Sequence, residues 1–305
     1  MPLEAASTTR DIGVRVLDMW SACCIVPNCR RKSRVRGYTC DMAIRRGYFD
    51  GPTGQIHYRT TGEGGEPLVL LHQSPLSSTQ FEAVLPALAA AGFHALALDM
   101  PGFGMSDAAP ESATLDDYAS IIPAAFAAFG WTHAHLVGHH TGAVVGAVYA
   151  AAQPQAVEKL VLNGFPLLSQ AERDHFATFY FGPKQPVADG SHFLTAWQNR
   201  LRSTPGWSDI ALMHRYTVEA LHRGATNWKA FPLVIGTDLT TVLQKLSVPT
   251  LLFTNTGEDL YDSTRRTREL RPDFFAYAEL QGGSHDIIDE QPRNWVREVE
   301  RFLRA

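Results

Sequence analysis

Short apolar runs alternate with segments of helical spacing from residue 44 to the C-terminal end. The runs that predict buried strands lie at residues 68–71, 94–98, 134–137, 159–162 and 250–254. The segments that predict helices lie at residues 81–91, 115–129, 141–152, 263–270 and 294–303. Two further segments, residues 47–50 and 55–60, flank a Gly-Pro-Thr-Gly turn and predict a hairpin. Because strands that alternate with helices need crossover connections, we expect an α/β fold with a mostly parallel central sheet flanked by helices.

One long segment interrupts this alternation. Residues 165–246 are predominantly helical in pattern and rich in aromatic side chains, including Trp197. An insertion of this size after a central strand is expected over the carboxyl ends of the strands, where such sheets bind ligands. The predicted organisation is a core of residues 42–164 and 247–305 with a helical cap of residues 165–246.

The first forty-one residues differ in composition from the rest. They hold all four cysteines of the chain and carry a net charge of +3, against −7 for residues 42–305. The cysteine spacing does not match the paired ligands of a zinc site. We expect residues 1–41 to be a disordered extension or the product of a start codon assigned too early.

Overall charge and hydropathy limit the possible partners. The net charge of −4 provides no positive field for nucleic acid, and no apolar run approaches the length of about 18 residues that a membrane span needs. The apolar patch at residues 19–27 is short and lies among arginines, which is a poor match to a signal peptide. We therefore expect a cytoplasmic protein that acts on a small molecule. The sequence makes no prediction of oligomeric state.

The sequence VGHHTG at residues 137–142 joins a predicted strand to a predicted helix. Gly138 and Gly142 stand two residues before and two residues after His140, as a sharp strand-turn-helix elbow requires. Four other stretches resemble motifs of one known family and occur in the same order as in that family: LLHQSP at 70–75, DMPGFGMSD at 99–107, the segment 249–262 and GGSH at 282–285. Over residues 44–304 the chain resembles the cap-bearing branch of the α/β-hydrolase family, and this resemblance implies the family's fold.

The resemblance also assigns roles to the site residues, and at two positions the chain departs from the family pattern. His140 stands where the family has its nucleophilic serine, and Gln73 stands where the family has a glycine. The resemblance implies that the backbone N–H groups of Ser74 and Thr141 form the oxyanion hole. It further implies that His285 is the general base, with Asp259 as its acid and Asp262 as the second choice. Asp286, beside His285, is expected to be solvated or to support the catalytic residues without contacting the substrate.

Four functions are compatible with a histidine at the elbow. In the first, a hydrolase, His140 attacks a carbonyl or holds a water that a His285–Asp259 pair deprotonates. In the second, a lyase, decarboxylase or isomerase, His285 moves a proton while His140 polarises a substrate oxygen. In the third, His140, His285 and Asp259 ligate a divalent metal. In the fourth, catalysis has been lost and the capped pocket only binds a small molecule.

We favour the first of these functions. The expected activity is hydrolysis of an ester, a lactone or a carbon–carbon bond beside a ketone, with no cofactor and no metal. The aromatic cap favours a small apolar or aromatic substrate, and we expect Gln73, His192 and Trp197 to contact it.

Overall fold

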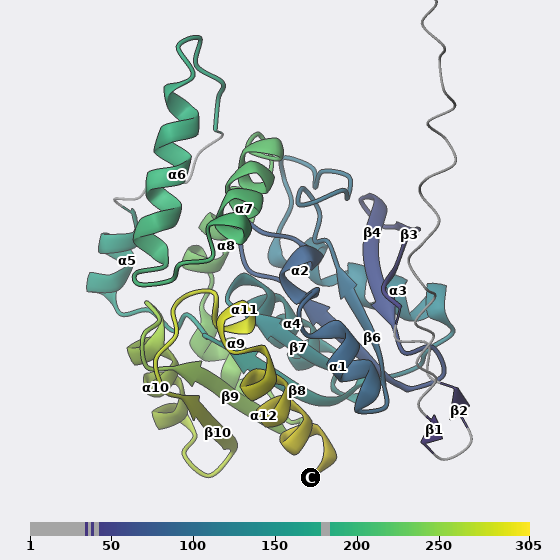
Figure 1. Ribbon diagram of the computed structural model, residues 1–305. Helices are drawn as coiled ribbons and strands as arrows, with labels where there is room; N and C mark the ends of the chain where they lie inside the picture. Colours follow the sequence, from purple (N-terminus) through teal and green to yellow (C-terminus); the bar gives the residue numbers. More distant parts are fainter. Residues whose placement is uncertain (1–33, 36–37, 40–42, 178–183) are drawn as a thin grey trace, which may run out of the picture. The chain divides into compact units, whose positions relative to one another are not determined.

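The computed structural model describes residues 34–35, 38–39, 43–177 and 184–305 (Figure 1). The described residues belong to one compact unit, Lys32–Ala305. The predicted extension, residues 1–41, lies outside the described residues except for strands β1 (Arg34–Val35) and β2 (Tyr38–Thr39), which pair antiparallel. Whether these residues are a disordered extension therefore stays a prediction.

An eight-stranded sheet lies at the centre of the described chain, in the order β10-β9-β8-β7-β5-β6-β4-β3. Its strands are β3 (Arg45–Gly51), β4 (Gly54–Thr61), β5 (Glu66–Leu71), β6 (Phe93–Leu98), β7 (Ala134–His139), β8 (Val157–Asn163), β9 (Thr250–Asn255) and β10 (Phe275–Leu280). The β3–β4 and β4–β6 pairs are antiparallel and every other pair is parallel. The predicted mostly parallel sheet and its hairpin are confirmed. The edge strand β10 was not predicted, because it is only partly buried and lacks a continuous apolar run.

Both faces of the sheet are covered, which explains the continuous apolar runs of the central strands. Alternate residues of β5 belong to different cores: Val69 and Leu71 pack into one, and Leu68 and Leu70 into the other. The first core is closed by helices α2 (Leu115–Ala119), α3 (Ile121–Phe129), α4 (Thr141–Ala152), α8 (Ala230–Gly236) and α9 (Leu239–Lys245). The second is closed by α1 (Leu85–Ala90), α11 (Ile287–Glu290) and α12 (Pro292–Arg304), and helix α10 (Tyr261–Leu270) packs against β9.

Two predicted helices differ from the observed ones. The helix expected over residues 81–91 is split into a 3₁₀ turn, η1 (Ser78–Phe81), and α1, because Pro86 occupies the first turn where a helix begins. The helix expected over residues 115–129 is interrupted at Ser120, which ends α2 and precedes α3. The helix expected over residues 141–152 is confirmed as α4.

Residues 165–246 contribute five helices to the described structure: α5 (Gln170–Ala177), α6 (Ser191–Ser203), α7 (Ile210–His222), α8 and α9. Helix α7 is bound to the core by side-chain hydrogen bonds, in which Glu219 accepts from Thr79 at 2.6 Å and Tyr216 donates to Asp289 at 2.6 Å. Helices α6 and α7 pack together, whereas α8 and α9 pack on α4. The predicted cap therefore ends in helices that belong to the layer covering the sheet. None of the helices in the described ranges has the length and apolar character needed to cross a membrane.

Candidate active site

The strand-turn-helix elbow is present, with His140 at its tip between β7 and α4. The backbone of His140 has φ 48° and ψ −108°, and it is the only non-glycine residue of the described chain with a positive φ. A Cβ on Gly138 would lie 2.3 Å from the Gly142 carbonyl oxygen, and one on Gly142 would lie 2.1 Å from that of Leu71. Both glycines are therefore needed to form the turn. A conformation of this kind costs about 1–3 kcal/mol and persists only where its surroundings enforce it.

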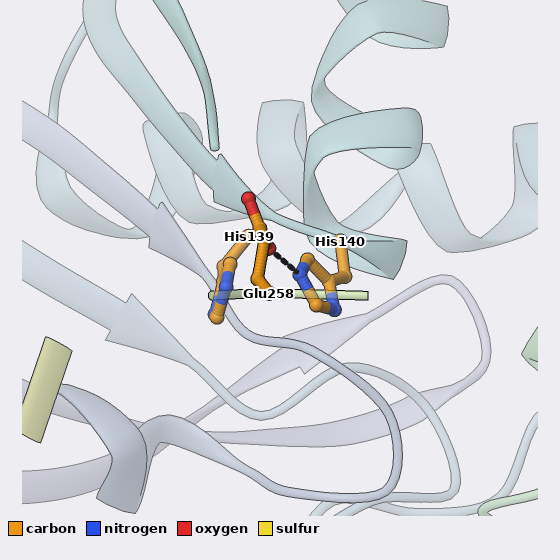
Figure 2. Close-up of side chains that lie close together, drawn as sticks. All are labelled: His139, His140 and Glu258. Atoms are coloured by element: carbon orange, nitrogen blue, oxygen red, sulfur yellow. Dashed lines mark hydrogen bonds and ion pairs between the residues drawn. The ribbon is translucent and has the colours of Figure 1, made fainter. Parts of the chain in front are cut away.

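The His140 side chain is paired with a buried carboxylate. Its Nε2 lies 2.7 Å from Oε2 of Glu258, in the loop after β9 (Figure 2). The other oxygen of Glu258 accepts a hydrogen bond from the Thr254 hydroxyl, and the Glu258 side chain is fully buried. Because the carboxylate accepts, Nε2 carries a proton. The lone pair of a neutral His140 is then on Nδ1, which has no hydrogen-bond partner among the described residues.

The space for this pair is provided by a third glycine. Gly164 follows β8 with φ +61°, and a Cβ there would lie 2.2 Å from Cδ2 of His140 and 2.7 Å from Oε2 of Glu258. The backbone N–H of Gly164 donates to the Phe253 carbonyl at 2.9 Å, which holds it at the end of the sheet. The side chains of His140 and Glu258 thus meet where Gly164 has none.

The expected pairing of His285 with Asp259 is not found. Nδ1 of His285 is buried and has no hydrogen-bond partner among the described residues, whereas Asp259 is exposed. The pKa of Asp259 is raised, first by loss of hydration; His140 acts in the opposite direction and lowers it, and the neighbouring Glu258 raises it. A carboxylate held by a histidine would instead have a lowered pKa. In this loop the Glu258 N–H donates to the Asn255 carbonyl. The turn directs the Glu258 side chain inward and leaves the Asp259 side chain exposed to solvent. The second choice, Asp262, is also exposed.

Three histidine rings gather at the elbow. The ring centroid of His140 lies 4.1 Å from that of His139 and 4.4 Å from that of His285. Burial lowers the pKa of His139 and of His285 well below the ordinary value, and the electrostatic interaction with the His140 ring lowers both further. His139 and His285 are therefore neutral at pH 7.

Hydrogen bonds determine which nitrogen of His139 carries its proton. The Gln73 N–H donates to Oε1 of Gln80 at 3.0 Å, so the amide of Gln80 turns its Nε2 toward Nδ1 of His139, 2.7 Å away. Since that amide nitrogen can only donate, Nδ1 of the neutral His139 accepts and Nε2 holds the proton. This proton lies on a buried nitrogen without a partner among the described residues.

The histidines at the elbow and Glu258 place potential metal ligands close together. Potential ligand atoms of His139, His140 and Glu258 lie within 4.8 Å of one another. A metal needs a free lone pair from each ligand, but Nδ1 of His139 is occupied by Gln80 and its Nε2 is protonated. These residues therefore do not fit a three-ligand metal site, and Asp259, the carboxylate of the metal hypothesis, does not pair with either histidine.

The two predicted oxyanion donors lie side by side. The Thr141 hydroxyl donates to the Ser74 hydroxyl at 3.0 Å, and the Gly142 N–H donates to the His72 carbonyl at 3.1 Å. These contacts join the loop after β5 to the first turn of α4. Among the described residues, no hydrogen bond occupies the backbone N–H of Ser74 or Thr141, so both groups remain able to donate to a substrate oxygen.

Of the predicted substrate contacts, Gln73 lies in the buried site. Its Nε2 donates to Oδ1 of Asp286 at 3.1 Å, and its Oε1 has no partner in the described structure. His192 and Trp197 are half-buried on α6, and the ring of His192 accepts from the Val187 N–H near its own helix.

The buried residue of α6 is instead Arg200, whose guanidinium donates to Asp286. Asp286 is fully buried, so of the two alternatives expected for it the solvated side chain is wrong, and a supporting role beside the catalytic residues is the one that remains. The functional candidates that sequence reasoning missed are thus Glu258, Gln80 and Arg200. The one available signal for Glu258 was its position beside Asp259, the carboxylate that the resemblance favours.

Comparison with known proteins agrees with this fold. The family model described as the alpha/beta hydrolase fold matches residues 66–259, and the chain belongs to this family. Its relatives include a 2-hydroxy-6-oxononadienedioate/2-hydroxy-6-oxononatrienedioate hydrolase of Burkholderia vietnamiensis, 36% identical over 119 residues, which are 38% of this chain and 41% of the relative. The hydrolase 2 of the same name from Pseudomonas putida is 34% identical over 125 residues, 40% of this chain and 43% of the relative. The chain thus matches about two fifths of these relatives' length.

Among solved structures, the enol-lactonase of Burkholderia xenovorans LB400 superimposes with a TM-score of 0.71 and 19% identity. The match covers 85% of this chain and all of the other. A likeness at this identity concerns the fold.

Proposed function

We propose that this protein is a cofactor-independent hydrolase that cleaves an ester, a lactone or a carbon–carbon bond beside a ketone in a small apolar or aromatic molecule. The observation that carries the proposal is the 2.7 Å pair between His140 and the buried Glu258 at the tip of the elbow. A histidine held by a carboxylate is the arrangement of a general base. The relatives, which are named hydrolases of a hydroxy-oxo dicarboxylate, support the same class of reaction.

In the proposed reaction His140 works as a base on water. Glu258 holds the proton on Nε2, so Nδ1 of the neutral ring takes a proton from a water molecule as its oxygen attacks the substrate carbonyl carbon. The carbonyl oxygen becomes an oxyanion that accepts from the N–H groups of Ser74 and Thr141, each worth roughly 3–4 kcal/mol at such sites. When the intermediate collapses, His140 returns the proton to the leaving oxygen. One water and one ester yield one acid and one alcohol.

His285 has a different role from the one that the family motif implies. Its Nδ1 is buried without a partner among the described residues. A buried acceptor without a hydrogen bond is tolerated at a lower cost in free energy than a buried N–H donor without one. The neutral ring therefore holds its proton on Nε2 and serves as a hydrogen-bond donor to the reacting oxygen. His285 stabilises negative charge in this scheme, while His140 moves the proton.

The test is hydrolysis of p-nitrophenyl acetate and butyrate by the metal-free full chain. The wild type should turn over at least one ester, and His140→Ala should lower kcat by at least about 100-fold, the lower range for a lost general base. His285→Ala should lower kcat as well, whereas His133→Ala, at an exposed surface histidine, should leave it unchanged. The absence of turnover by the wild type, or full activity of His140→Ala, would contradict the proposal.

A further inference from the structure

A buried ion pair joins the cap to the loop that carries His285. The guanidinium of Arg200, on α6, donates to Oδ2 of Asp286, and both side chains are buried. The other oxygen of Asp286, Oδ1, accepts from Nε2 of Gln73 at 3.1 Å. One carboxylate therefore connects a cap helix, the histidine loop and the loop that carries Ser74.

This connection lies at the reacting residues. Asp286 directly follows His285, and Gln73 directly precedes Ser74. The charge of Arg200 acts on His285, whose pKa is lowered first by burial, then by His140 and by Arg200. The net charge of the Arg200–Asp286 pair therefore contributes to the charge around His285.

The site has no uncompensated positive charge in the described structure. The charge of Arg200 is balanced by Asp286, and the His140–Glu258 pair carries a charge of zero or −1 in either state of the histidine. Burial lowers the pKa of Arg200 to about 10, so it stays charged at pH 7. Further groups act on Arg200 as negative charges when ionised: Tyr216, Asp289, Glu219 and Glu290.

The remaining polar atoms suit an uncharged ligand. Nε of Arg200 and Oε1 of Gln73 are buried without hydrogen-bond partners among the described residues, which leaves one donor and one acceptor on either side of Asp286. An amide, hydroxyl or ester group can use a single donor or acceptor. A carboxylate buried beside Arg200 and Gln73 would find no cation to pair with, because Arg200 is already paired with Asp286. Burial of an unpaired charge is strongly unfavourable.

We propose that Asp286 is a specificity-determining residue that makes the site select uncharged substrates and reject carboxylates. This inference rests on the proposed function, because it assigns the Arg200 side of the site to the substrate. It separates this chain from the relatives above, whose printed substrates are dicarboxylates. Removal of the Asp286 charge should turn Arg200 into a carboxylate-binding group.

The test compares binding of phenylacetamide and phenylacetate at pH 7 by isothermal titration calorimetry of the full chain. These two ligands have similar shape and differ in charge. The wild type should bind phenylacetamide at least tenfold more tightly than phenylacetate. Asp286→Asn should bind phenylacetate at least tenfold more tightly than the wild type does. The double variant Asp286→Asn/Arg200→Gln should lose that gain, and Asp273→Asn, at an exposed loop position, should resemble the wild type.

Several results would overturn the proposal. Equal binding of both ligands to the wild type would do so even if Asp286→Asn does not fold. A folded Asp286→Asn without a gain for phenylacetate, or a gain that persists without Arg200, would also contradict it. If neither ligand binds any of the proteins, Arg200 does not line a site for them and the proposal is wrong. Because binding is measured without turnover, an inactive wild type would refute the proposed hydrolase and leave this test intact.

Discussion

Replacing Gly164 by alanine adds a methyl group in the space where His140 and Glu258 meet. The new Cβ would lie 2.2 Å from Cδ2 of His140, 2.4 Å from its Nε2 and 2.7 Å from Oε2 of Glu258. Ordinary van der Waals contact begins near 3.4 Å, so the imidazole must move by about 1.2 Å or the backbone must shift. Either displacement breaks the geometry of the pair that we propose as the base.

The magnitude follows from two contributions. An alanine at φ +61° costs about 1–2 kcal/mol because its Cβ approaches the following carbonyl oxygen. The clash adds about 1–3 kcal/mol, as is usual when a packed interior is overfilled. We expect Gly164→Ala to lose roughly 2–5 kcal/mol of unfolding free energy. A displacement of about 1 Å at a catalytic group should lower kcat by about 100-fold.

A second glycine provides the matched control. Gly130 ends α3 with φ +69°, and a Cβ there would meet nothing within 4 Å. Gly130→Ala therefore has the same backbone strain without the clash, and should lose about 1–2 kcal/mol with unchanged kcat. Urea unfolding gives the stability and p-nitrophenyl ester hydrolysis gives kcat. If a folded Gly164→Ala keeps full activity, the close approach of His140 to Glu258 has no catalytic importance.

Two further predictions concern pH and metal. Burial raises the pKa of Asp289 to about 7, against about 3.9 for an unfolded aspartate, so its contribution to stability is present below pH 4 and is lost as the pH rises through 7. In urea titrations from pH 4 to 8, Asp289→Asn should therefore gain up to about 4 kcal/mol relative to the wild type; a difference that does not change with pH would contradict this. Because the accepting nitrogen of His139 is occupied by Gln80, treatment with EDTA should leave ester hydrolysis unchanged; activity lost to EDTA and restored by zinc would refute that reasoning.

The elbow could be predicted from the sequence because its determinants are local. Gly138 and Gly142 are both required by backbone contacts within a few residues of His140 or with the adjacent strand. The continuous apolar runs of the central strands are equally direct, since burial on two faces removes polar positions. The edge strand β10 lacks that signal because only part of it is buried.

The partners of the histidines could not be predicted in the same way. The resemblance favours Asp259, but its acidic neighbour Glu258 is the residue that faces inward. The loop that turns Glu258 inward includes a hydrogen bond from the Glu258 N–H to the Asn255 carbonyl, and the motif spacing carries no information about this turn. The burial of Arg200 depends on how α6 packs against the loop after β10, which joins residues 86 positions apart. Such long-range pairings leave no periodic signal in the chain.

The neighbouring carboxylates also allow the most direct test of the account. The measurement is kcat for p-nitrophenyl ester hydrolysis by the wild type, Glu258→Gln and Asp259→Asn, with folding checked by circular dichroism. If His140 is the base and Glu258 holds its proton, Glu258→Gln should lose at least about 100-fold, while Asp259→Asn should stay within a few-fold of the wild type. Full activity in Glu258→Gln together with its loss in Asp259→Asn would contradict the account and return the acid to the position that the family motif implies.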